Sequence, residues 1–77
     1  MQLELEVLKR VFNSRIEAEI EKYNNGQHNK KETIDILGEI SAIIIELSDE
    51  YKSTDQNISN EIWNIKDASD DFLENLF

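Results

Sequence analysis

The sequence of 77 residues contains no cysteine and no proline, and it contains only two glycines. The lack of cysteine excludes disulfides, thiolate nucleophiles and zinc–thiolate sites. A chain this short buries only about 60% of the surface that its unfolded form exposes, so small domains usually depend on disulfides, metals or partners. We therefore expect self-association or a bound partner to supply additional burial.

Basic residues are scarce in this sequence. Eight lysines and arginines stand against 17 acids, which gives a formal net charge of -9. Such a charge repels the phosphates of nucleic acids and anionic lipids, so we expect no direct nucleic-acid binding and no membrane contact. Most of the charge lies in residues 46–77, whose net charge is -7. The expected partner is therefore a basic protein.

The sequence also lacks long apolar runs. The longest apolar stretch, residues 40–47, includes Ser41 and Glu46, whereas a membrane span needs about 20 residues. The first residues are acidic where a signal peptide would be basic. These features predict a cytoplasmic protein without a membrane span.

Two turn-like segments, 24–29 and 52–55, separate three segments whose apolar residues recur at spacings of three and four. This pattern predicts one all-α domain over residues 1–77, with helices at about 3–24, 30–52 and 56–76. The expected architecture is a three-helix bundle, or a helical hairpin plus a third helix. The alternation of Leu and Glu at residues 3–7 leaves a short strand as an alternative, although a lone strand would need a partner.

Polar residues and one glycine mark the ends of the predicted helices. Gly26 suits the left-handed backbone that closes a helix. Asn29 followed by Glu32 has the spacing of a capping box for the second helix. The third helix has three candidate caps, namely Ser53, Thr54 and Asp55.

The first two helices carry more apolar surface than one contact inside the chain would cover. On a wheel of about 100° per residue, the apolar residues of 3–12 spread over roughly 200°. The second helix has a main apolar face, and Ile34 and Ile45 lie opposite that face. Its main face consists of Ile36, Leu37, Ile40, Ile43, Ile44, Leu47 and Tyr51. If the second helix is simply the central member of a bundle, both of its sides are covered within the chain.

This excess apolar surface predicts an interface with a second copy of the chain, because two-fold dimers are the commonest oligomers. We expect a dimer or a larger helical bundle. The residues assigned to this interface are Leu3, Val7, Val11, Ile34 and Ile45.

The third helix has a candidate partner-binding face. Its buried stripe is predicted to contain Ile58, Ile62, Ile65, Phe72 and Leu76. Trp63 falls on another side of the wheel, among Asp67, Asp70 and Glu74. An aromatic anchor among charges is typical of a binding hot spot for a basic partner. The alternative is that Trp63 flanks the bundle core or lies in the interface between copies.

Features of an enzyme are few. The single histidine, His28, lies in a turn among asparagines and is predicted to be solvated or capping rather than a general base. The acid-x-x-acid pairs at residues 46 and 49 and at residues 67 and 70 could in principle hold Mg²⁺. They are similar to paired motifs of all-α nucleotide pyrophosphatases of the MazG type, over four residues in total. We expect no enzyme activity, no cofactor and no metal site.

These features predict a small acidic helical module that binds a larger, basic protein and inhibits or regulates it. Phage-encoded inhibitors and anti-defence proteins are often small acidic chains of this kind. Carboxylates on successive helical turns lie about 5–6 Å apart, so an acidic face could mimic nucleic acid. The alternative function is structural, with self-assembly or scaffolding as the purpose of the excess apolar surface.

Overall fold

The chain folds into helices connected by short turns. The computed structural model describes residues 2–77, and it describes side chains from Glu4 onward. The helices are α1 (Gln2–Asn24), α2 (Lys30–Lys52), α3 (Gln56–Ile65) and α4 (Asp67–Leu76). The all-α prediction is confirmed, and the alternative of a strand near the N-terminus is wrong because α1 covers that segment.

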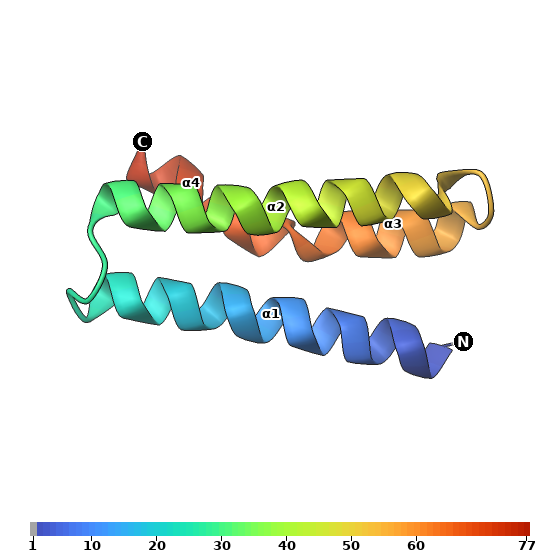
Figure 1. Ribbon diagram of the computed structural model, residues 1–77, viewed down its shortest axis with the longest axis horizontal. Helices are drawn as coiled ribbons and strands as arrows, with labels where there is room; N and C mark the ends of the chain where they lie inside the picture. Colours follow the sequence, from blue (N-terminus) through green and yellow to red (C-terminus); the bar gives the residue numbers. More distant parts are fainter. Residues whose placement is uncertain (1) are drawn as a thin grey trace.

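The helices form a bundle of three helical segments, the third of which is α3 followed by α4. In Figure 1, α2 and α3 run antiparallel side by side, and α1 runs along one side of them. The bundle measures 40 × 22 × 15 Å. Its core contains one leucine and five isoleucines from α1, α2 and α3: Ile16, Leu37, Ile40, Ile44, Ile62 and Ile65.

The turns use the predicted caps. Gly26 closes α1 with a positive φ of 78°, a conformation that glycine adopts without a steric penalty. The Asn29 side chain accepts a hydrogen bond from the Glu32 amide at 2.8 Å, and the Glu32 side chain accepts one from the Asn29 amide at 3.0 Å. Asp55 caps α3 by accepting from two amides of its first turn. Each bond satisfies a backbone donor that a helix start leaves free.

The predicted third helix, 56–76, is interrupted at Lys66. There the amide hydrogen bonds to the Trp63 carbonyl at 3.3 Å, which is a tighter turn than the α-helical bond to residue i−4. α4 then restarts with two acids in its first turn, Asp67 and Asp70, where the helix dipole favours negative charge. Despite the interruption, the predicted sides of α4 hold, because Phe72 packs against the core whereas Asp67 and Glu74 are exposed.

Small side chains let α2 approach α3 and α4 closely. Ser48 and Ser59 are buried, and each hydroxyl donates to the backbone carbonyl of the other residue, at 3.0 and 2.9 Å. Nearer the start of α2, Ser41 and Ser69 of α4 are also buried, with their hydroxyls 3.4 Å apart. We call these four residues the serine seam, which joins α2 to α3 and α4 by packing and by hydrogen bonds.

Polar contacts fasten α1 to its neighbours. Lys9 donates to the Glu61 carboxylate at 2.9 Å. The pKa of the Lys9 amine is raised, and this hydrogen bond is the main cause. The Glu19 carboxylate is buried and lies 2.5 Å from the Nδ1 of His28. The ring of His28 is thus not solvated, because the turn carries it back to α1, whereas its amide caps the end of α1 by donating to the Lys22 carbonyl at 3.3 Å.

No helix in the described part of the chain, residues 2–77, is long and apolar enough to cross a membrane.

Candidate partner-binding groove

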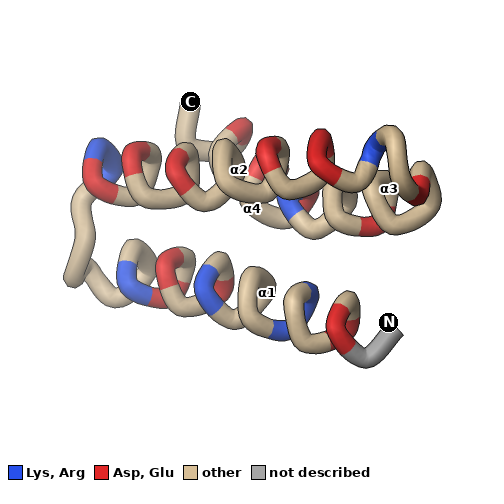
Figure 2. The backbone as a smooth tube through the Cα atoms, turned by 45° about the vertical axis from the view of Figure 1, so that its right-hand side comes forward, with Lys and Arg blue, Asp and Glu red and all other residues tan. Residues whose placement is uncertain are grey.

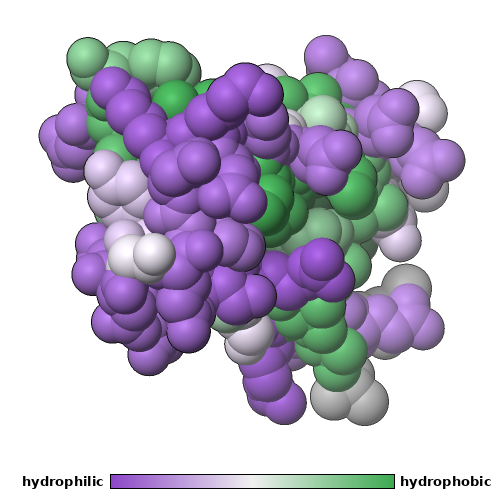
Figure 3. Space-filling view, turned by 60° about the vertical axis from the view of Figure 1, so that its left-hand side comes forward, coloured by the Kyte–Doolittle hydropathy of each residue, from purple (hydrophilic) through white to green (hydrophobic). Residues whose placement is uncertain are grey.

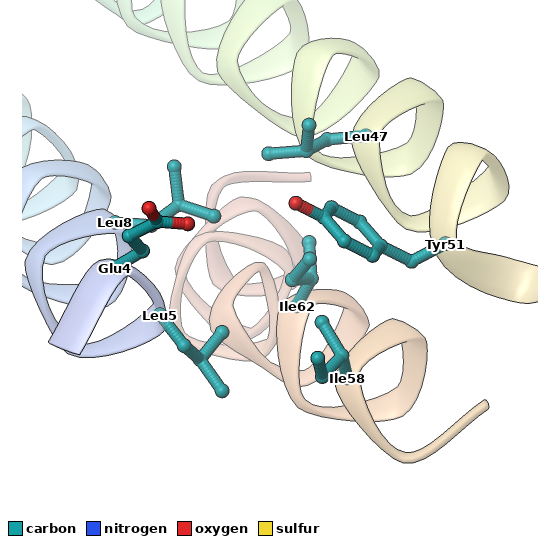
Figure 4. Close-up of a pocket in the computed structure, with 7 residues that line it drawn as sticks. All are labelled: Glu4, Leu5, Leu8, Leu47, Tyr51, Ile58 and Ile62. Carbon is teal, nitrogen blue, oxygen red and sulfur yellow. The ribbon is translucent and has the colours of Figure 1, made fainter. Parts of the chain in front are cut away.

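An apolar pocket opens between α1, α2 and α3, at the end of the bundle where the N-terminus lies (Figures 1 and 4). Its volume is about 180 Å³. Leu47 and Tyr51 come from α2, while the Glu4 carboxylate of α1 and the Tyr51 hydroxyl both point into the space. The lining residues are Glu4, Leu5, Leu8, Leu47, Tyr51, Ile58 and Ile62. The pocket is therefore mostly apolar, with polar atoms at opposite sides.

The exposed surface of α2 continues from this pocket. It carries Ile43, Glu46, Leu47, Asp49 and Glu50, all on this one helix, so it is an open surface, and Leu47 belongs to both the surface and the pocket. Half of the Ile43 surface, 51%, is exposed. We call the pocket and this surface of α2 together the acidic groove, since apolar residues lie beside carboxylates there.

Charged and apolar residues are unevenly distributed over the molecule. Figure 2 shows acids recurring along α2, whereas basic and acidic residues alternate along α1. In Figure 3, apolar side chains gather into a band within an otherwise hydrophilic surface. An exposed apolar surface with a polar rim is typical of an interaction site.

The exposure of Ile43 corrects the predicted core face of α2. On the wheel, Ile40 lies at the centre of that face, Leu37 and Ile44 lie toward one flank, and Ile43 lies at the edge of the other. The bundle covers the centre and the first flank, where Leu37, Ile40 and Ile44 are buried. It leaves Ile43 open because the two neighbouring segments, α1 and α3 with α4, do not surround α2 completely.

The predicted face around Trp63 is already engaged within the chain. Trp63 is 42% exposed, and the Lys66 ammonium lies 4.4 Å from its ring centroid. Lys66 also donates to Asp70. The structure leaves Asp67 and Glu74 exposed. Two residues of the predicted binding face thus have partners inside the molecule, because Lys66 forms a cation–π contact with Trp63 and an ion pair with Asp70.

The residues predicted for self-association differ in their exposure. Val7 and Val11 of α1 are 47% and 50% exposed, whereas Ile34 and Ile45 of α2 are half-buried. The side chain of Leu3 lies outside the described residues. Exposed apolar surface therefore remains on α1.

The acid pairs at residues 46 and 49 and at residues 67 and 70 do not join into a larger cluster. Among residues 2–77, no group of three or more His, Cys, Asp or Glu side chains is placed to hold a metal ion.

Sequence reasoning did not identify the acidic groove, although its α2 part has a visible pattern. Ile43 and Leu47 are four residues apart, and Glu46 and Glu50 accompany them at the same spacing. This pattern places an apolar pair beside an acidic pair on one helix. Comparisons with protein-family models, curated proteins and solved structures found no match to this chain.

Proposed function

We propose that this protein is a small binding module that holds a basic amphipathic helix of a larger protein in the acidic groove, and so inhibits or regulates that protein. The observation that carries the proposal is the apolar pocket that adjoins exposed Ile43 and the carboxylates of α2. An amphipathic helix commonly binds by laying its apolar face in such a groove.

The charge of the groove selects the class of partner. Glu46, Asp49 and Glu50 lie on the open surface of α2, and Glu4 lines the pocket. Lysine or arginine side chains beside the apolar face of a partner helix would meet these carboxylates. Complementary charge mainly raises the association rate and excludes acidic partners, whereas the apolar anchors supply most of the affinity.

The apolar floor favours a protein partner over mimicry of nucleic acid. A mimic needs an array of carboxylates and no apolar pocket, because it competes for a basic surface. Here Leu47 and Tyr51 contribute apolar lining beside the acids. A leucine or phenylalanine of the partner helix would suit the pocket.

The proposal is tested with a fluorescent peptide of about 18 residues, with leucine at helical spacing and lysine elsewhere. We expect it to bind, and we expect salt to weaken binding by screening. A peptide with glutamate in place of lysine should not bind. Equal binding of both peptides, or binding that salt leaves unchanged, would contradict the electrostatic part of the proposal.

Two pairs of variants locate the binding site. E46K/E50K should weaken binding about tenfold, a loss of about 1.4 kcal/mol in binding free energy, because two exposed attractive charge contacts become repulsive. The matched control D67K/E74K changes the net charge equally but alters the Trp63 face. I43S should also weaken binding, whereas F77S, at a residue 82% exposed, should not. If only D67K/E74K reduces binding, the partner site is the Trp63 face instead.

A further inference from the structure

We propose that two copies of this chain associate through the outer face of α1, antiparallel about a two-fold axis. This face consists of Val7, Val11, Ser14 and Ala18, all exposed. In Figure 1, the other helices lie together on the opposite side of α1. The spacings of four, three and four are those of the a and d positions in a coiled coil. The face therefore has the geometry of a helix–helix contact and no partner among the residues that the structure describes.

The sizes of these side chains suit an antiparallel pair. Valines occupy the N-terminal half of the face, and Ser14 and Ala18 occupy the C-terminal half. A two-fold axis midway between Val11 and Ser14 sets each valine of one copy against a small residue of the other. Large and small residues that alternate across an interface allow close packing.

Charge on the flank of this face is self-complementary. Arg10 and Glu17 are seven residues apart on the same flank, and both are exposed. Neither forms an ion pair within the described part of the chain. In an antiparallel pair, equivalent flanks meet, so Arg10 of each copy approaches Glu17 of the other. The two-fold axis forms this contact twice.

The distribution of charge also identifies a second copy as the occupant. Residues 2–24 carry a net charge of only -1, whereas the whole chain carries -9. Two copies repel each other over most of their surface, because both surfaces carry a net negative charge. The outer face of α1 is the region where repulsion is small and where opposite charges pair.

The test measures mass by sedimentation velocity from about 5 µM to about 1 mM, since a small interface implies weak association. We expect twice the chain mass at the upper end. V11D should give a monomer with unchanged helical circular dichroism, since Val11 lies outside the core. A wild-type chain that stays monomeric throughout, or a dimer unaffected by V11D, overturns the proposal.

Charge exchange tests the pairing directly. R10E and E17R should each weaken the dimer about fivefold, because each brings like charges together across the axis. The double variant R10E/E17R should return to within about twofold of wild type. K30E, which changes the net charge as R10E does at an exposed position off α1, is the matched control and should leave most of the dimer intact. Failure of the double variant to recover overturns the antiparallel pairing.

The absence of native cysteine permits a check of direction. Under oxidation, V11C/S14C should form covalent dimers, since these positions face each other across an antiparallel axis. V11C alone should not crosslink to itself. Efficient crosslinking of V11C alone would indicate parallel helices and would overturn the proposed geometry.

Discussion

Glu19 shows how one buried carboxylate depends on one partner. Its side chain is 5% exposed and lies 2.5 Å from His28 Nδ1, while the His28 side chain is 24% exposed. Burying a charged or polar group is costly unless a hydrogen bond replaces its contact with water. The turn between α1 and α2 supplies this partner, so the contact stabilises both the turn and the packing of α1.

We predict that H28A lowers the free energy of unfolding by about 1–3 kcal/mol, because it leaves the Glu19 carboxylate without its partner. Urea unfolding followed by circular dichroism measures this change. E19L added to H28A should recover part of the loss, since an apolar side chain needs no partner. If H28A is as stable as wild type, the contact does not stabilise the fold.

At the scale of elements, the serine seam accounts for the close contact of α2 with α3. Ser48 and Ser59 are 3% exposed, and their hydroxyls lie 2.9 Å apart. Bulky residues at these positions would hold the helices further apart. The hydrogen bond from each hydroxyl to the backbone carbonyl of the other residue satisfies the polar groups that such close contact buries.

We predict that S48V destabilises the protein by about 1–3 kcal/mol, because the added methyl groups overpack the seam and the hydroxyl bonds are lost. S48A is the matched comparison, since it removes the hydroxyl without adding bulk, and it should cost about 1 kcal/mol. Thermal and urea unfolding both report this difference. A S48V protein as stable as S48A would show that the seam has room for the larger side chain.

At the scale of the whole molecule, the net charge of -9 opposes the compact state. Attractive pairs such as Lys9–Glu61 and Lys66–Asp70 engage few of the 17 acids. The repulsion between the remaining acids acts over long distances, and dissolved salt weakens it by screening the charges. Stability should therefore depend on ionic strength.

We predict that raising NaCl from about 0.01 M to about 1 M, which shortens the Debye length from about 30 Å to about 3 Å, raises Tm. A gain of about 1 kcal/mol would correspond to about 4–8 °C for a chain of this size. Differential scanning calorimetry of V11D separates this effect from changes in association. A Tm that falls with salt would mean that the ion pairs contribute more than the repulsion.

The sequence by itself determined the helical segments and their caps. Apolar spacing, Gly26, and Asn29 with Glu32 act locally, within a few residues along the chain, so their structure follows from the sequence pattern. The same is true of the uneven charge. For this reason the all-α class and the starts of α2 and α3 could be predicted.

Only the tertiary structure decided which apolar residues stay exposed and which polar groups meet. The helical wheel did not show the break at Lys66, whose contacts with Trp63 and Asp70 are those of residues three and four apart on a helix. It also assigned Ile43 to the core, and it had no means of bringing His28 to Glu19. The exposure of Ile43 and the contact of His28 with Glu19 depend on the angles at which helices pack and on the path of the turn, which bring together residues distant in sequence. The pocket of the acidic groove arises in the same way, because its lining comes from three helices.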